Sequence, residues 1–465
     1  MKKLATPLLC TLLLAGCAGT PVPRALAPAL SPQKFDGPVA DGAPIWPQTE
    51  WWQGFGDPAL ARLIQEAQDN NRDLSAAAAR VLEAEARARI QDAALYPQLN
   101  GGASGSGCTR GGASCSSFGL NLSASYEADF WGQAHANLRA AQEQLKSARF
   151  ARQSAALSLA ANVAQRYFEL LAVRRQIAIA NEQAAAINTI LDVVQVKVRA
   201  GSVSRFDLAR ELAQVEQVQA SLPGLQTQEK QTLYALAVLL GRVPQGYAIS
   251  GDNLDGIAAP KVGPGLPSDL LLRRPDVAGA EADLAAAHAN VDAARAAFFP
   301  NISLAAGGGF ASAAIGTLLQ GDHFGVSYGA SLLQSIFDGG ALAGRSDLAK
   351  ATQAEYLARY QAAALGAYAD VENALTSFAN TGLAEGHLRR AIESSREAFE
   401  ISQLQYRQGA TDLLNVIQAQ QTLFSAEGQL VQVTLNNREA AVHLFEALGG
   451  GWQEAPEDRT QTATP

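Results

Sequence analysis

The sequence predicts an α+β protein, built as a tandem duplication, in which strands of a shared transmembrane β-barrel alternate with very long helices. Three observations predict it. A helix that ends in aromatic residues and a proline, and then becomes an alternating strand, occurs twice, as AALYPQLNG (93–101) and AAFFPNISL (296–304). The following segments alternate between apolar and small polar residues. After the first pair of strands, Gln133–Arg199 contains neither proline nor glycine.

The first residues have the pattern of an export signal. Two lysines precede an apolar stretch, Leu4–Leu14, that is too short to span a bilayer, and LAGC, which ends at Cys17, resembles the lipobox of bacterial lipoproteins. We expect a signal peptide over 1–16, a covalent lipid on Cys17 and a lipid-anchored segment over 17–56. The alternative is an ordinary cleaved signal with Cys17 incidental. Alanine after the cysteine, in place of an inner-membrane retention aspartate, favours the outer membrane.

The charge of the chain argues against nucleic acid as a partner. The formal net charge is −8, and removal of two lysines with the signal makes it −10 (−8 − 2). There is no basic block, so nucleic acid is not expected as a partner.

Cys108 and Cys115 lie close together in GCTRGGASC, and an exported protein meets an oxidising compartment, so we expect a disulfide between them. The alternative is two free thiols in a loop.

Landmarks recur at a nearly constant spacing, which indicates an internal duplication. The prolines Pro97 and Pro300 are 203 residues apart (300 − 97), and we expect a helix-to-strand joint at each. Asp57 before Pro58 predicts the start of a first helix that runs to the first joint. The expected segments are a first repeat (57–250) with a helix, a β-hairpin and long helices, a Gly/Pro-rich linker (251–265), a second repeat (266–450) with the same order, and a disordered tail (451–465).

The strands alternate in the manner of outer-membrane strands. In FGLNLSASYEADF (118–130) and FGVSYGASL (324–332) every second residue is apolar, and NISLAAGGGF after Pro300 alternates in the same way. The segment after Pro97 does so more weakly. A soluble antiparallel sheet with one buried face would also alternate. The export signal and the Gly/Ser-rich face favour the barrel.

Four strands are too few for a barrel from one chain. The smallest single-chain barrels have about eight, and an open sheet in lipid would leave its edge groups unpaired. We therefore expect a barrel shared between subunits, with about eight strands in a dimer or about twelve in a trimer.

The helices are longer than those of ordinary globular domains. Gln133–Arg199 has 67 residues (199 − 133 + 1), and its apolar residues from Leu159 to Val198 recur on average every 3.5 residues (39/11), the coiled-coil period. The alternative is a soluble bundle of amphipathic helices, against which the length argues. In the second repeat one heptad frame is fitted by Leu414, Ile417, Phe424, Val431, Leu435, Val442 and Phe445.

These features resemble the outer-membrane factor family of efflux and secretion ducts (the TolC/OprM/NodT type). WWQGFGDPALARLIQEAQDNNRDLSAAAARVLEAEA (51–86) looks like the opening segment of the family, and LPSDLLLRRPDVAGAEADLAAAHANVDAARAAFFPNISL (266–304) looks like its most specific signature. The resemblance implies a homotrimer, whose four strands per protomer form one twelve-stranded barrel in outer-membrane lipid. It also implies a periplasmic α-helical barrel with a small equatorial domain.

The resemblance also implies a role and partners. The expected function is the passive exit duct of a tripartite efflux system, with a periplasmic adaptor (membrane fusion) protein and an inner-membrane pump, often of the resistance-nodulation-division type. A type I secretion duct and a periplasmic coiled-coil scaffold lipoprotein without a pore remain alternatives. An enzyme has no supporting motif, since Walker A, HExxH, CxxC and GxSxG are absent and the five histidines lack ligand spacing. No metal and no cofactor are expected apart from the lipid on Cys17.

In the family, the helical turns at 199–207 and 407–415 form the periplasmic tip. Both carry Arg-x-Gly here, in which glycine suits a tight turn and arginine either anchors the adaptor or neutralises a helix C-terminus. The positions of an acidic ring found in some members hold Asn415 and Gln418, so we expect a gate held by hydrogen bonds and by pairs such as Arg205 or Arg407 with Asp207. The candidate tip residues are Arg199, Gly201, Arg205, Asp207, Arg407, Gly409, Asp412, Asn415 and Gln418.

Overall fold

A computed structural model describes residues 34–37, 48–110, 113–251, 254–260, 270 and 273–452. The predicted signal peptide, Cys17 and most of the predicted tail lie outside the described residues. The chain divides into two compact units. The first contains the strands with the helical segments next to them, including most of the helices at 72–93 and 275–296, and the second contains the remaining parts of the helices.

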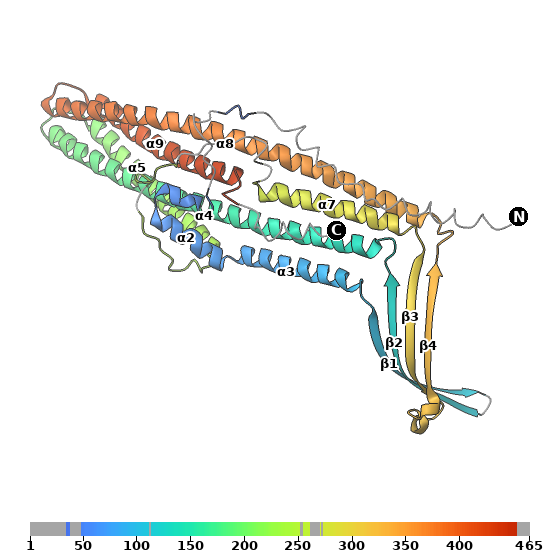
Figure 1. The fold of residues 1–465 in the computed structure, drawn as a ribbon. Coiled ribbons are helices and arrows are strands. Elements are labelled where there is room, and N and C mark those ends of the chain that lie inside the picture. Colours follow the sequence, from blue (N-terminus) through green and yellow to red (C-terminus); the bar gives the residue numbers. More distant parts are fainter. Residues whose placement is uncertain are drawn as a thin grey trace. The chain divides into compact units, whose positions relative to one another are not determined.

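In each half of the chain a 22-residue helix, two strands and two long helices follow one another in the same order (Figure 1). The first half holds η2 (Trp51–Phe55), α2 (Pro58–Asn70), α3 (Arg72–Ala93), β1 (Gln98–Arg110), β2 (Ala113–Ala128), α4 (Gln133–Arg199) and α5 (Arg205–Leu239). The second half holds α7 (Pro275–Ala296), β3 (Asn301–Ser312), η3 (Ile315–Thr317), η4 (Gly321–His323), β4 (Phe324–Leu333), α8 (Ala341–Gln408) and α9 (Leu413–Ala447).

Matching elements of the two halves have matching lengths. Helices α3 and α7 have 22 residues each, α5 and α9 have 35 each, and α4 and α8 have 67 and 68. The tandem repeat is therefore confirmed, and α4 has the bounds that the proline- and glycine-free run predicts. The segment boundaries predicted at 57, 250, 266 and 450 stay predictions.

The first predicted helix is wrong in one respect, because it is broken at Asn71. Asp57 does cap α2, since its side chain accepts a bond from the amide of Ala59 (2.7 Å). At Asn71 the backbone turns extended (ψ 132°). The Asn71 side chain then accepts from the amide of Leu74 (2.9 Å) and donates to the carbonyl of Leu239 (2.9 Å). An asparagine that satisfies helix ends with its side chain stops α2 without proline or glycine.

The strands form one antiparallel sheet in the order β1-β2-β3-β4. The register places Leu120 beside Phe310 and Phe310 beside Phe324, so the apolar rows predicted on separate strands join into one face. The other face carries mainly Gly, Ser and Asn, as in the neighbours Gly307 and Ser327. The predicted alternation is confirmed on β2, β3 and β4, whereas the side of β1 that continues the apolar face carries mainly small residues, as at Gly101 and Ala103.

The far end of the β1–β2 hairpin holds the two predicted disulfide cysteines. Cys108 lies opposite Cys115 in the strand register, and Cys115 is disulfide-bonded. The side chain of Cys108 lies outside those described, so its pairing with Cys115 stays a prediction.

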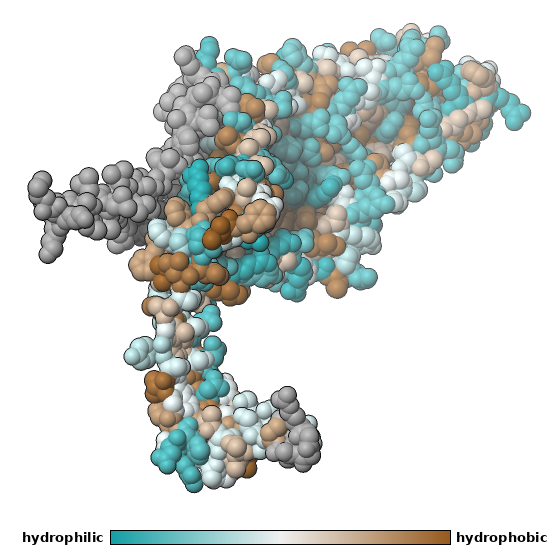
Figure 2. All heavy atoms as spheres, turned by 90° about the vertical axis from the view of Figure 1, so that its right-hand side faces the viewer, coloured by the Kyte–Doolittle hydropathy of each residue, from teal (hydrophilic) through white to brown (hydrophobic). Residues whose placement is uncertain are grey.

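Strands begin directly after both prolines, and aromatic side chains gather there. Strand β1 starts after Pro97 and β3 after Pro300. Trp131 stacks on Phe299 (4.8 Å between ring centroids), and its indole N–H donates to the carbonyl of Pro300 (2.8 Å). Figure 2 shows hydrophobic side chains gathered where the strands meet the helices of the same unit. Such exposed aromatics are typical of membrane interfaces, where an amphipathic ring lies between lipid and water.

The second unit is held by an aromatic cluster and by apolar helix seams. Trp51 of η2 stacks on Phe445 (5.1 Å), and Phe55 packs against Phe168 at the same centroid distance. The Tyr167 hydroxyl donates to Asp57 (2.7 Å), which ties the start of α2 to α4. Among the described residues, no helix has a stretch long and apolar enough to cross a bilayer.

Candidate functional site

The predicted tip residues lie in two helix-to-helix turns or in the helix ends beside them. The turns are residues 200–204 between α4 and α5 and residues 409–412 between α8 and α9, here called the tip turns (Figure 1). The two turns are tied together. The Lys197 ammonium donates to the carbonyl of Tyr406 and lies 4.1 Å from the centroid of the Tyr406 ring. This contact places a cation at the end of α8, where carbonyl groups lack helical partners.

Glycine makes both tip turns possible. Gly201 and Gly409 have φ values of 73° and 77°, in the left-handed region that other residues avoid. After each glycine the next amide reaches back to the helix, from Ser202 to Lys197 (3.0 Å) and from Ala410 to Gln405 (2.8 Å). These bonds satisfy the last carbonyls of α4 and α8 in the same way in both halves.

The start of the following helix differs between the tip turns. Ser204 accepts a bond from the amide of Asp207 (3.2 Å), and the Asp207 carboxylate accepts from the amide and hydroxyl of Ser204. This is a reciprocal capping box. Asp412 holds the matching position in the second half, but its side chain makes no capping hydrogen bond. There, Asn415 donates to the Thr411 hydroxyl (2.8 Å).

Within the part of the chain that the structure describes, the predicted ion pairs of the gate are not formed. Among the described residues, the Asp207 carboxylate bonds Ser204, and no ion pair joins Asp207 to Arg205 or Arg407. The capping box uses this carboxylate locally. The gate pairing and the adaptor role of the arginines stay predictions. The exposed members of the predicted set are Arg199, Gly201, Arg205, Arg407, Gly409, Asp412, Asn415 and Gln418.

The structure adds a pair of exposed apolar residues that sequence reasoning missed. Phe206 is 72% exposed and Leu414 is 44% exposed, each in the first turn of the helix after its tip turn. They are 208 residues apart (414 − 206), the same spacing as between the tip-turn glycines Gly201 and Gly409 (409 − 201). That spacing was the signal that could have found them. The heptad prediction of Leu414 as a seam residue is wrong, because Leu413 is buried in the apolar cluster in its place, whereas the predicted Ile417 does lie in that cluster.

Glu211 is the second residue that sequence reasoning missed. It is fully buried in α5, and within the described part of the chain neither of its carboxylate oxygens has a hydrogen-bond partner. Burial raises its pKa to about 7, against the opposing effect of Arg210. In the sequence Glu211 follows Arg210, and two neighbouring charged residues usually indicate a solvent-exposed helix face. The signal is its spacing from Leu208 and Val215, three and four residues away on one helix face.

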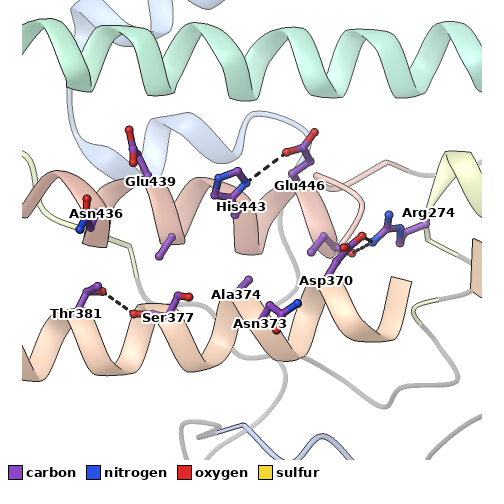
Figure 3. A pocket seen from close by; sticks show the side chains of 12 residues that line it. Arg274, Asp370, Asn373, Ala374, Ser377, Thr381, Asn436, Glu439, His443 and Glu446 are labelled. Carbon is purple, nitrogen blue, oxygen red and sulfur yellow. Dashed lines mark hydrogen bonds and ion pairs between the residues drawn. The ribbon is translucent and has the colours of Figure 1, made fainter. Parts of the chain in front are cut away.

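A polar groove of about 640 Å³ lies between α8 and α9 (Figure 3). At one end Arg274, from the predicted family signature, bonds Asp276 (2.7 Å) and Asp370 (2.9 Å). Burial acts to raise the pKa of Asp276, but the hydrogen bond and charge of Arg274, together with nearby backbone amides, outweigh burial and lower that pKa. The arginine thus links the start of α7 to α8.

The same groove contains His443 beside Glu446 (3.8 Å). The bond to Glu446 raises the pKa of His443, and the Ser158 hydroxyl also donates to Glu446 (2.7 Å). These contacts tie α4 to α9. Among the described residues, no group of three or more His, Cys, Asp or Glu side chains has the arrangement of a metal site. The groove therefore has the contacts of a helix-linking polar seam.

Sequence comparison places the chain in a known family. Residues 63–242 and 266–450 match the family described as outer membrane efflux protein. The pyoverdine export outer membrane protein OpmQ of Pseudomonas aeruginosa is 38% identical over 469 residues, which cover 97% of this chain and 98% of that protein. The cation efflux system protein CusC of Escherichia coli is 31% identical over 458 residues, which cover 96% and 98%.

Solved structures agree with the sequence comparison. The outer-membrane channel OprN superposes with a TM-score of 0.87 at 27% identity, covering 94% of this chain and 100% of that chain. The open state of the MtrE outer membrane channel of Neisseria gonorrhoeae gives a TM-score of 0.85 at 30% identity, covering 90% and 95%. The chain therefore belongs to the outer membrane efflux protein family and is an outer-membrane channel for efflux.

Proposed function

We propose that three copies of the chain form a passive exit duct, and that the duct receives its cargo from an inner-membrane pump through a periplasmic adaptor. The observation that carries the proposal is the four-stranded sheet, in which β1 and β4 each pair on one side only within the described residues. Unpaired edge groups in lipid cost several kcal/mol each, roughly. Three sheets joined edge to edge remove every edge and give about twelve strands, an even number within the range of outer-membrane barrels.

The two faces of the sheet support this arrangement. The apolar face suits lipid, whereas the face that carries Gly307, Ser327 and their neighbours is small and polar and suits a wet lumen. The stacked pair Trp131 and Phe299 lies at the strand ends, where an interface belt is expected. A lipid on Cys17 would add a second anchor.

The tip turns supply a surface for the adaptor. Phe206 and Leu414 are exposed apolar residues at matching positions of the repeat, and Arg199 and Arg407 are exposed beside the tip turns. Large exposed apolar side chains rimmed by charged ones are typical of protein contacts. Six such sites in a trimer would suit a ring of adaptor subunits.

The cargo is proposed to be small molecules or ions rather than proteins. The names of relatives that match nearly the full chain mention pyoverdine export, cation efflux, solvent efflux and toluene efflux. This range of cargo fits a duct that is itself unselective and receives molecules that the pump has selected. It favours efflux of small molecules, of the multidrug or pyoverdine type, over type I secretion, with a pump of the resistance-nodulation-division type as the first candidate.

The first test is the mass and conductance of the purified protein. We expect a trimeric mass in detergent by native mass spectrometry, and channels in planar bilayers once the tip turns are loosened. A monomeric mass together with no conductance would overturn the proposal and leave the scaffold lipoprotein as the better reading.

A matched pair of variants tests which face of the sheet meets lipid. Val326 and Ser327 are neighbours on β4 that point to opposite faces. Val326→Arg is expected to weaken insertion by roughly 2–4 kcal/mol if the site lies near the bilayer centre. Ser327→Arg is expected to insert normally and to shift the channel toward anions, read as a changed reversal potential in a salt gradient. The opposite result for the two variants would reverse the assignment of the faces.

Site-specific photo-cross-linking tests the adaptor surface. A photo-reactive residue at position 206 or 414 should capture the adaptor in cells. Val243 is a suitable control, because it is 74% exposed and lies beyond the end of α5 away from the tip turns. Equal capture from all three positions, or capture from 243 alone, would move the adaptor contact elsewhere.

A further inference from the structure

Glu211, an ionisable residue, lies in the apolar seam between α4 and α5, close to the tip turn that joins these two helices. Leu208, Glu211, Val215 and Val218 follow one another on α5 at steps of three, four and three residues, the spacing of a seam. Val215 and Val218 pack with Ile187 and Leu191 of α4, and Leu208 packs against the same cluster. Glu211 occupies a seam position among them and is fully buried.

The surroundings of Glu211 offer no compensation for a charge. Neither carboxylate oxygen has a hydrogen-bond partner among the described residues, and the buried hydroxyl of Tyr406 on α8 also lacks one. A carboxylate held in this way is much less stable than a neutral acid, because burial removes water without supplying donors. This makes the closed packing of the seam dependent on the proton.

Few charged groups face this position. Arg210 on the same helix acts against the raised pKa of Glu211, and Glu211 and Asp207 together raise the pKa of Tyr406 after burial. Lys197 of α4 lies over the Tyr406 ring, where its ammonium is committed to the Tyr406 carbonyl. In the adjoining apolar cluster the buried α9 residues are uncharged: Leu413, Val416, Ile417 and Leu423.

We propose that Glu211 is a proton-operated latch of the tip: the neutral acid holds α5 against α4 and α8, and loss of the proton releases the α4–α5 hairpin from the closed packing. This inference rests on the proposed duct, because the latch matters only where the tip turns close an entrance. The second half of the repeat has no counterpart, since position 419, 208 residues after 211, is alanine.

The direction of the pH effect follows from the raised pKa. The pKa of the Glu211 carboxyl is about 7 when the side chain is buried and returns to its ordinary value of 4.5 when the side chain is released into water. The stability that the neutral acid gives the seam is fully present below pH 4.5 and is lost as the pH rises through about 7. Between pH 6 and pH 8 the ratio of released to packed seam should rise about tenfold per protomer.

The experiment compares the full-length channel with Glu211→Gln, which keeps the shape of the neutral acid but cannot ionise. Channel openings in planar bilayers are recorded at pH 6 and pH 8. The wild type should be about tenfold more open at pH 8, whereas Glu211→Gln should stay within twofold at the low level of the wild type at pH 6. Glu216→Gln is the matched control, because Glu216 is an exposed carboxylate on the same helix, and this variant should behave as the wild type.

A second readout does not depend on conductance. Hydrogen exchange of residues 205–218, corrected for the intrinsic effect of pH, should lose protection between pH 6 and pH 8 in the wild type and in Glu216→Gln but not in Glu211→Gln. The infrared band of protonated carboxylic acids should be stronger at pH 6 in the wild type than in Glu211→Gln, and this difference should shrink at pH 8. A merely structural role of the side chain would not give a difference that depends on pH.

The outcomes separate the latch from the duct. If Glu211→Gln keeps the pH dependence of the wild type in exchange and conductance, or if the wild type shows no pH dependence of either, the latch is overturned while the duct stands. If the protein is monomeric and forms no channel although the exchange of residues 205–218 changes with pH, the proposed duct fails instead.

Discussion

The two halves of the duplication bury a glutamate in opposite ways. In the first half Glu211 of α5 is fully buried without a hydrogen-bond partner among the described residues. In the second half Glu427 of α9 is buried as well, but one of its oxygens accepts from Arg396 of α8 (2.7 Å). The backbones of the two halves match in element length and turn geometry. Duplication therefore preserved the scaffold and left the polar groups in the seams free to diverge.

The difference separates a seam that depends on pH from one that depends on an ion pair. An arginine partner holds a buried carboxylate in place through an ion pair, whereas burial without a partner favours the neutral acid. The packing of the α4–α5 hairpin should therefore change with pH, whereas that of the α8–α9 hairpin should depend on its ion pair. The following predictions test that division.

The largest effect is expected from Arg396→Leu in the second half. Loss of the arginine leaves Glu427 buried and unpaired, like Glu211. Such a loss is worth roughly 3–5 kcal/mol for a fully buried pair, and we expect about 2 kcal/mol here because the Arg396 side chain is half exposed. Hydrogen exchange of α9 around residue 427 measures it. The double variant with Glu427→Gln should recover most of the loss, and failure to recover would show that packing rather than charge was removed.

A smaller and equal effect is expected at the glycines of the two tip turns. Valine at position 201 or 409 must adopt a positive φ, which costs roughly 1–2 kcal/mol, and open space around both glycines adds no clash. Hydrogen exchange at the ends of α4 and α8 measures the change. Ala200→Val and Ala410→Val are the controls, because these neighbours have negative φ. Effects that differ by more than twofold between the halves would show that the two turns are not equivalent.

The smallest effects are expected at the N-caps. Ser204→Ala removes the capping box of α5 and should destabilise its first turn by about 1 kcal/mol. Asp412→Ala should change the start of α9 by only a few tenths of a kcal/mol, roughly, because Asp412 makes no capping bond. Exchange rates of the first amides of each helix measure both. An equal loss in the two variants would mean that Asp412 caps α9 in the assembled protein.

Periodic features of this chain could be predicted from the sequence because repetition averages out individual residues. The uninterrupted helix of 133–199, the alternating strands and the duplication each depend on many positions, and each agrees with the structure. The Arg-x-Gly turns could be predicted because glycine at a positive φ is a local requirement.

Features that depend on a single side chain and its distant partner could not be predicted. Asn71 breaks a helix because it reaches Leu239, 168 residues away, and nothing near Asn71 in the sequence reveals that partner. Glu211 follows Arg210 and reads as part of a solvated face, although tertiary packing buries it. Leu414 fits a heptad frame but lies one residue away from the seam position taken by Leu413.

The pairing of β2 with β3 has a consequence for how the sheet is assembled. These strands come from different halves of the chain, and they pair over eleven residues, from Phe118 with Ser312 to Ala128 with Ile302. If the halves were separate polypeptides, this pairing would be a bimolecular encounter between two hairpins. The covalent link replaces that encounter with an effective local concentration on the order of millimolar. Cutting the chain between the halves should therefore slow barrel assembly in dilute protein far more than it weakens the finished barrel.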